Sequence, residues 1–308
     1  LDYQLLHTEY GHFLGEQVNA FIDKYQLHYQ VQFIASHGHT TFHLPHKKTT
    51  VQLGDGAAIA AETGIPVISD LRALDVALGG QGAPIVPIGD KLLFGEFSYC
   101  LNIGGIANIS ARSADKYVSF DICPANRVLN LLAAKAGKVY DDGGAIAASG
   151  NVNPALLATL NNFPFYGEQY PKSLSNDFGV GVIYPLILQE ESRTENALRT
   201  YTEHIALQVT AAVEQIKKNI SPETEPATML VTGGGAFNTF LIQSIREQVK
   251  QHNIELLVPD EKIIQYKEAL VMALIGVLRW REENNVMSSV TGAMRNSVGG
   301  AIWMGQEA

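Results

Sequence analysis

Cysteine and long apolar stretches are scarce in this chain. Its 308 residues include two cysteines, Cys100 and Cys123, which is too few for a disulfide framework and typical of a reducing cytoplasm. No apolar run reaches about 18 residues, and no basic segment followed by an apolar one stands at the N-terminus. These absences predict a cytoplasmic protein with no membrane partner.

Clusters of basic residues are also missing. The chain has 22 Lys and Arg against 31 Asp and Glu, which gives a formal net charge of −9. Nucleic acids bind through clustered Lys and Arg, so this balance argues against a nucleic-acid partner. The length predicts two domains, and 46% hydrophobic residues suffice for substantial cores.

Short apolar runs alternate with helical patterns along the chain. In roughly the last eighty residues this order predicts a largely parallel sheet covered by helices. Asp55 is placed to cap a helix over 56–62, and Glu268 to open an apolar helix over 267–280. No linker interrupts the pattern, and the predicted domains are 1–99 and 100–308, both α/β.

Glycine-rich turns follow three predicted strands, at 79–82, 104–105 and 233–235. Ligands of open parallel sheets bind where the strands end, and turns without side chains let backbone N–H groups approach a phosphate. None of the three has the spacing of a P-loop or of a dinucleotide fingerprint. Each turn alone can be purely structural, such as a hairpin turn at 104–105. The set of three favours a nucleotide ligand.

Three further sets of polar residues stand at or just beyond predicted strand ends. Asp121 ends an apolar run beside the 104–105 turn and precedes a helix predicted over 124–136, a position that suits a base. His37 belongs to a set of four histidines in ten residues, but no Cys or carboxylate joins them at ligand spacing, so contact with a sugar hydroxyl is favoured over a metal. Arg72 and Asp75 flank a short apolar pair, where a surface ion pair is the simplest alternative.

Several longer motifs carry a family resemblance. They are Ser36-His-Gly-His-Thr40, Gln52-Leu-Gly-Asp55, Ser69-Asp-Leu-Arg72, Gly79-Gly-Gln-Gly-Ala-Pro84, Asn102-Ile-Gly-Gly-Ile-Ala-Asn108, Thr232-Gly-Gly-Gly-Ala-Phe-Asn238 and Lys267-Glu-Ala269. In this order, over nearly the whole chain, they resemble the motifs of anhydro-N-acetylmuramic acid kinases. The resemblance implies a two-lobed actin-like or hexokinase-like ATPase fold, with ATP, Mg²⁺ and the sugar held between the lobes.

The resemblance also implies an activity. Members of this family hydrolyse the 1,6-anhydro bond of anhydro-N-acetylmuramic acid and phosphorylate O6, a step of cell-wall recycling. Another sugar kinase of the same superfamily, or an inactive sugar-binding homologue, remains an alternative. The expected partners are the anhydro amino sugar and ATP, with a homodimer as a further expectation.

Roles follow for individual residues that match the motifs. Asp121 would be the catalytic base. Nucleotide and phosphate binding would fall to Asn102, Gly104, Gly105, Asn108, Gly233, Gly234, Gly235 and Asn238. Substrate binding would fall to His37, Arg72, Gln81 and Glu268. No residue is expected to ligate a metal directly.

Three stretches depart from the family pattern. Asp121-Ile-Cys-Pro-Ala-Asn126 stands where the family has Asp-Thr-Gly-Pro-Gly-Asn, so two glycines are replaced while the aspartate is kept. Leu174 to Asp177 replaces the usual Thr-Gly-Arg-Glu, which weakens the case for a functional loop there. The family's Gly-Thr-Ser-Leu-Asp-Gly phosphate hairpin has no counterpart. We therefore expect a first lobe that is incomplete at its N-terminus, and little turnover by residues 1–308 alone.

Overall fold

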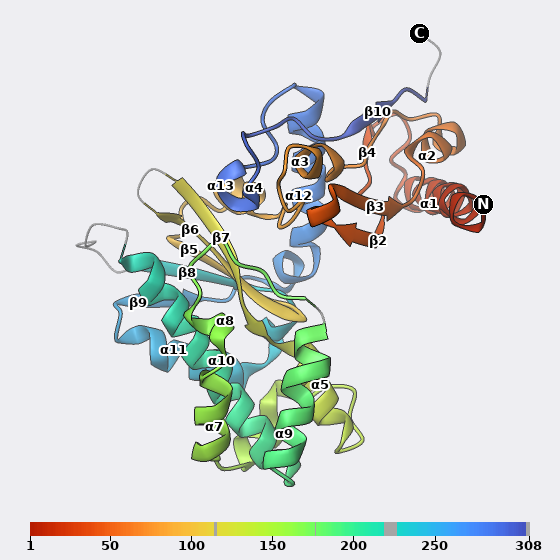
Figure 1. Cartoon of the computed structure of the whole chain (residues 1–308). Helices are drawn as coiled ribbons and strands as arrows, with labels where there is room; N and C mark the ends of the chain where they lie inside the picture. Colours follow the sequence, from red (N-terminus) through yellow and green to blue (C-terminus); the bar gives the residue numbers. More distant parts are fainter. Residues whose placement is uncertain (114–115, 176, 219–226, 306–308) are drawn as a thin grey trace. The chain divides into compact units, whose positions relative to one another are not determined.

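The computed structural model describes residues 1–113, 116–175, 177–218 and 227–305, and the chain divides into two compact units (Figure 1). Unit 1 comprises Leu1–Leu92 together with Glu268–Ala308, and unit 2 comprises Leu93–Lys267. The α/β class with two lobes is therefore confirmed. The expected boundary is corrected at the C-terminal end, because strand pairing returns residues 268–308 to unit 1.

Unit 1 contains a small three-stranded sheet and a separate hairpin. Its elements are α1 (Asp2–Tyr25), β1 (Ile34–Ala35), β2 (His39–Leu44), β3 (Thr49–Leu53), α2 (Gly56–Thr63), β4 (Val67–Ser69), α3 (Ala73–Ala77), α4 (Pro87–Leu93), most of α12 (Glu261–Trp280), α13 (Ser288–Thr291) and β10 (Ala301–Trp303). The sheet has the order β1-β4-β10, with β1 parallel and β10 antiparallel to β4. β2 and β3 form the hairpin, and α1 packs along α2 (Figure 1).

Local signals explain part of unit 1. The side chain of Asp55 accepts a hydrogen bond from the backbone N–H of Ala57 at 2.9 Å, so the predicted cap of α2 is confirmed. The predicted start of the apolar helix is wrong, because α12 begins at Glu261 and Glu268 lies inside it. The first two turns of the helix mix Ile263 and Ile264 with charged residues. The apolar pattern becomes dense only after residue 267, which hid the true start of the helix.

Unit 2 is built around a five-stranded sheet. Its elements are β5 (Tyr99–Ile103), β6 (Ile106–Ser113), β7 (Lys116–Pro124), α5 (Asn126–Ala134), α6 (Ala145–Ser149), α7 (Pro154–Asn161), α8 (Pro164–Gly167), a π-helical turn (Phe178–Ile183), α9 (Tyr184–Glu190), α10 (Thr194–Lys217), β8 (Ala227–Thr232), a short 3₁₀ turn (Gly234–Phe237), α11 (Thr239–Lys250) and β9 (Ile254–Leu257).

The strand order of this sheet is β7-β6-β5-β8-β9. β8 and β9 are parallel, as predicted from the strand–helix alternation in the last eighty residues. β5 is also parallel to β8, whereas β5, β6 and β7 form an antiparallel meander. Pro124 ends β7 rather than opening the next helix, so α5 starts two residues later than its proline signal indicated. Proline is tolerated there because a strand end needs no further N–H donor.

Helix α10 provides the main cover for this sheet. It packs against β6, β7 and α5 (Figure 1). Its Tyr201, Ile205 and Val209 are completely buried in the core of unit 2. The opposite face carries a smaller cluster of Phe94, Cys100 and Leu230. The two faces of the sheet therefore differ, and the face with the smaller apolar cluster also carries polar side chains.

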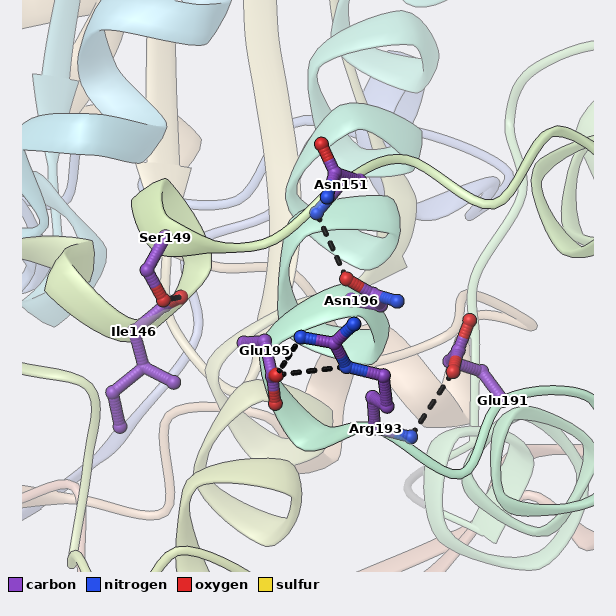
Figure 2. Close-up of polar contacts among 7 residues, drawn as sticks. All are labelled: Ile146, Ser149, Asn151, Glu191, Arg193, Glu195 and Asn196. Atoms are coloured by element: carbon purple, nitrogen blue, oxygen red, sulfur yellow. Dashed lines mark hydrogen bonds and ion pairs between the residues drawn. The ribbon is translucent and has the colours of Figure 1, made fainter.

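The start of α10 is held by surface contacts (Figure 2). The guanidinium of Arg193 donates to Glu195 Oε1 from Nε at 2.9 Å and from Nη2 at 2.6 Å, and the Arg193 N–H donates to Glu191. The side-chain oxygen of Asn196 accepts from the Asn151 N–H at 2.9 Å. Exposed pairs of this kind contribute little stability, so they define where the helix begins rather than hold unit 2 together.

No helix in the described parts of the chain is both long enough and apolar enough to span a bilayer.

Candidate functional site

Four polar side chains form one row across unit 2. In the strand register Asp121 of β7 is opposite Asn108 of β6, Asn108 is opposite Asn102 of β5, and Asn102 is opposite Thr232 of β8. Residues aligned in this way project from the same face of a sheet. The predicted base and two predicted phosphate contacts are thus brought together by register, near the ends of β5, β7 and β8.

A β-bulge lies directly after Asp121. Ala107 is opposite Cys123 and Asn108 is opposite Asp121, so Ile122 is an extra residue in β7 without a partner of its own. Bulges re-aim neighbouring side chains and occur often beside active sites. Sequence reasoning missed this bulge, because an added residue in an apolar run leaves no local signal.

Asp121 is partly buried and has a perturbed acidity. Burial raises the pKa of its carboxyl group from 3.8 to about 6, while the hydrogen bond from the Leu174 backbone N–H acts in the opposite direction. That N–H lies 2.9 Å from Asp121 Oδ2. A carboxylate with a pKa near neutrality is suited to accept a proton during turnover.

The Gly104-Gly105 turn contacts the beginning of α5. The carbonyl of Gly105 accepts hydrogen bonds from the N–H groups of Ala125 and Arg127, and the carbonyl of Gly104 accepts from that of Asn126. The side-chain amide of Asn126 donates to Ile103 O at 3.0 Å. These first N–H groups of α5 are therefore occupied, and the turn itself, with an exposed Gly105, is the remaining place for a phosphate to approach.

The glycines after β8 differ in what they do. A side chain on Gly235 would overlap Ile103, and one on Gly233 would lie 2.7 Å from Asn102 Oδ1, at a backbone φ of +81°. A Cβ on Gly234 would meet only Asn126 Nδ2, at an ordinary 3.5 Å. Gly233 and Gly235 are therefore required by packing and conformation, whereas Gly234 has free space beside it.

That space belongs to a cavity of about 420 Å³ within unit 2. α5 contributes Asn126 and Asn130 to its wall, and the opposite side is formed by residues 140–143, Gly234, Phe237 and Asn238. Asn238 uses its side-chain oxygen to cap α11 through the Leu241 N–H at 3.0 Å. The cavity combines exposed aromatic side chains, Tyr140 and Phe237, with amide groups, which suits a nucleoside.

A separate polar cluster lies in unit 1 around Arg72. Its Nε donates to His37 Nε2 at 2.9 Å and its Nη1 donates to Gly82 O at 2.6 Å. His37 Nδ1 is 3.1 Å from Gly38 O, so the geometry fits a neutral ring with its proton on Nδ1. Burial, followed by the charge of Arg72, lowers the pKa of His37, which agrees with a neutral ring.

Glu268 also belongs to this cluster. Burial lowers the pKa of Arg72, and the negative charge of Glu268 opposes that effect, so the two groups lie within electrostatic reach. Arg72 forms no ion pair with any residue that the structure describes. The guanidinium keeps N–H donors free for an external anion.

The surface ion pair between Arg72 and Asp75, which was the alternative interpretation of these residues, does not form. Asp75 is fully buried; its carboxylate accepts from the Gly82 N–H at 2.7 Å and from the Thr291 hydroxyl at 2.7 Å. The turn at 79–82 follows helix α3 rather than a strand, which corrects the prediction for that turn. Asp75 holds this turn, and sequence reasoning missed that role because Thr291 is distant in the chain.

The predicted site residues therefore fall into two groups. Asp121, Asn102, Asn108 and the glycine turns lie in unit 2, and His37, Arg72 and Glu268 lie together in unit 1. Gln81 is exposed and is held through its backbone, because its N–H donates to Thr291 O at 2.8 Å. Within the described ranges no three His, Cys, Asp or Glu side chains gather as a metal site would require.

Comparison with known proteins agrees on one family. A family model described as anhydro-N-acetylmuramic acid kinase matches residues 2–305. The curated protein of that name from Haemophilus influenzae is 34% identical over 306 residues, covering 93% of this chain and 79% of its own length. The one from Saccharophagus degradans is 33% identical over 312 residues, covering 97% and 82%.

Solved structures add little to this. Component A of the (R)-2-hydroxyglutaryl-CoA dehydratase from Acidaminococcus fermentans is 14% identical and has a TM-score of 0.34, over 66% of each chain. A score this low establishes no common fold.

Proposed function

The chain belongs to the anhydro-N-acetylmuramic acid kinase family, and from this premise we propose that it opens the 1,6-anhydro bond of anhydro-N-acetylmuramic acid with water and phosphorylates O6. ATP would be the phosphate donor, and the product would be N-acetylmuramic acid 6-phosphate. The observation that carries the proposal is the position of Asp121, which stands beside a bulge in the row of Asn102 and Asn108 with its pKa raised to about 6.

Asp121 would act as the base for water. Its carboxylate takes one proton from the water whose oxygen bonds to the anomeric carbon, as in an inverting glycosidase. The bond between the anomeric carbon and O6 breaks, and its electron pair stays on O6. O6 then bonds to the γ-phosphorus of ATP, and ADP leaves with the electrons of the broken phosphoanhydride bond.

The nucleotide would be bound by unit 2. We infer that the phosphates lie over the Gly104-Gly105 turn and that the nucleoside enters the cavity beside Gly234, where Asn126 and Asn238 offer polar contacts. Asn102 supports this placement because its amide lies next to both Gly104 and Gly233. Positioning of this kind accounts for most of the catalysis of phosphoryl transfer.

Mg²⁺ would arrive with the nucleotide. The described residues offer no cluster that could hold a resident metal ion, and Mg²⁺ commonly keeps several waters and binds through phosphate oxygens. Its chemical contribution would be to neutralise charge on the phosphates.

An enzyme that depends on ATP is expected in the cytoplasm, and a homodimer remains a proposal.

The sugar would be recognised by the cluster in unit 1. A muramic acid carries a lactyl carboxylate, and the free N–H donors of Arg72 are its natural partner. Neutral His37 holds Arg72 in place through Nε. Glu268 is exposed and can accept hydrogen bonds from sugar hydroxyl or acetamido groups, and Gln81 is proposed to do the same from its exposed position.

The origin of the new oxygen on the anomeric carbon tests this reaction. The chain is incubated with ATP, Mg²⁺ and anhydro-N-acetylmuramic acid in ¹⁸O water, at a protein concentration high enough to detect the little turnover expected of residues 1–308, and products are identified by mass spectrometry. We expect a 6-phosphate with ¹⁸O on the anomeric carbon and ¹⁶O at O6, sampled at early times because hydration of the open-chain aldehyde slowly introduces ¹⁸O at the anomeric carbon without any enzyme. Phosphorylation of free N-acetylhexosamines instead would indicate another sugar kinase, and sugar binding without any product would indicate an inactive homologue.

A further inference from the structure

Residues 170–174 run beside β7 and hold Asp121 by its main chain and its side chain together. The Asp121 N–H donates to Lys172 O at 3.1 Å, and the Leu174 N–H donates to Asp121 Oδ2 at 2.9 Å. β7 is an edge strand of the sheet, so its outward N–H groups need partners from outside the sheet. This segment supplies one at the position of the base.

The segment is anchored independently of Asp121. The ring of Tyr170 stacks on Phe120 of β7 with centroids 5.1 Å apart. The Lys172 ammonium donates to Phe165 O at 3.1 Å and lies 4.7 Å from the centroid of the Phe165 ring. These contacts place the main chain at 172–174, and the Asp121 carboxylate is oriented by its hydrogen bond to that main chain.

We propose that the backbone N–H of Leu174 is a positioning group for the base, fixing Oδ2 of Asp121 and leaving Oδ1 free to accept the proton of the attacking water. The inference rests on the role proposed for Asp121. Among the described residues Oδ1 accepts no hydrogen bond. A fixed carboxylate presents one oxygen in a constant direction, which general-base catalysis requires.

Burial is the largest influence on the ionisation of Asp121, and the Leu174 N–H is the second and acts against it. Burial raises the pKa of Cys123 on the same strand, so the thiol stays neutral. On β6 the facing residue is the uncharged Asn108, and from α10 Tyr201 donates to Pro124 O at 2.7 Å. Lys172 is the nearby cation, and its ammonium is engaged by the Phe165 carbonyl.

A backbone donor also accounts for the departure of position 174 from the family pattern. Any residue except proline supplies an N–H, so the side chain at position 174 is free to vary while the contact with Asp121 is kept. Leu174 can therefore act through its main chain although its side chain departs from the family pattern.

A spectroscopic test needs no turnover. The full chain is labelled with ¹⁵N-leucine, and the Leu174 amide is followed by NMR from pH 4 to pH 8. We expect this amide to titrate with a midpoint at about 6, the pKa of Asp121, and to lose the titration in Asp121→Asn. An amide that does not titrate in the unmodified protein overturns the inference.

A pair of substitutions tests the effect on catalysis. Leu174→Pro removes the N–H, so the acid limb of kcat/KM should move upward by about one pH unit. Leu174→Ala keeps the N–H, and its limb should stay where that of the unmodified protein lies. An unmoved limb in a folded Leu174→Pro protein would count against the positioning role alone, whereas an active Asp121→Asn protein would count against the proposed function itself.

Discussion

The two sets of candidate site residues, the row in unit 2 and the cluster around Arg72 in unit 1, are assembled in different ways. In unit 2 the row from Asp121 to Thr232 is set by strand register, so main-chain hydrogen bonds place the side chains. In unit 1 the cluster around Arg72 is set by side chains, which bond to one another and to the carbonyls of loops. Register gives a rigid arrangement, while a side-chain network depends on every member being present.

This contrast predicts how each group responds to substitution. A conservative change in the row should remove a chemical function and leave the geometry intact. A change in the cluster should disturb binding and the loop at 79–82 together, since Arg72 Nη1 and the Asp75 carboxylate both bond to Gly82.

The largest effect is expected at Asp121. Asp121→Asn keeps the shape and the bond to Leu174 but removes the basic oxygen, so kcat should fall by roughly 10²–10⁴ with sugar affinity retained. Steady-state kinetics and calorimetry measure the two quantities. Asp23→Asn, on the exposed surface of α1, serves as the control, and near-normal turnover in Asp121→Asn would refute the role of base.

Arg72 should give the next largest effect. Arg72→Ala removes the donor for the lactyl carboxylate, so KM for the muramic substrate should rise by about 10- to 100-fold. Arg72→Lys keeps the charge but loses the two directed bonds to His37 and Gly82. Its KM should therefore lie between the KM of the unmodified protein and that of Arg72→Ala. If Arg72→Ala binds the sugar as well as the unmodified protein does, the carboxylate is held elsewhere.

The glycines after β8 allow a matched comparison of stability and binding. Gly235→Ala brings a methyl group into Ile103, and we expect its free energy of unfolding to fall by about 1–3 kcal/mol. Gly234→Ala has room and should unfold like the unmodified protein, whereas the larger Gly234→Val should weaken ATP binding measured by calorimetry. Equal destabilisation by the two alanine variants would contradict the distinction.

A last effect of Asp121→Asn is on stability and has the opposite sign to its effect on activity. Because the folded-state pKa of Asp121 is raised to about 6, its ionisation disfavours the fold above that pH, and the penalty disappears as the pH falls toward 3.8. Asp121→Asn should therefore stabilise the protein at pH 8 by at most about 3 kcal/mol, and less after solvent screening. Urea unfolding at pH 8 and pH 5 measures the difference, which should shrink at the lower pH.

Local signals in the sequence were sufficient for several features of the fold. The cap at Asp55 depends on residues close in the chain, and it is present. The parallel pairing of β8 and β9 follows from the alternation of strands and helices along the chain, and it is present too. The family motifs identified the family that the comparisons show. The glycine turns at 104–105 and 233–235 also follow strands as predicted.

Other features were decided by contacts between distant residues. The return of β10 to the sheet of β4, the bond from Thr291 to Asp75 and the bond from Leu174 to Asp121 join positions 53 or more residues apart. The bulge at Ile122 depends on which residue of β6 lies opposite, and Gly235 is required because Ile103 packs against it.

The local elements and the family could be predicted from residues close together in the chain, because these follow from short-range geometry and from motifs of contiguous residues. Contacts between distant segments settle which oxygen of Asp121 is held, which glycines are required by packing and which residues accompany Arg72. Hydrogen bonds and close packing act over a few ångströms in space, and separation along the chain does not reveal which groups will meet at that distance.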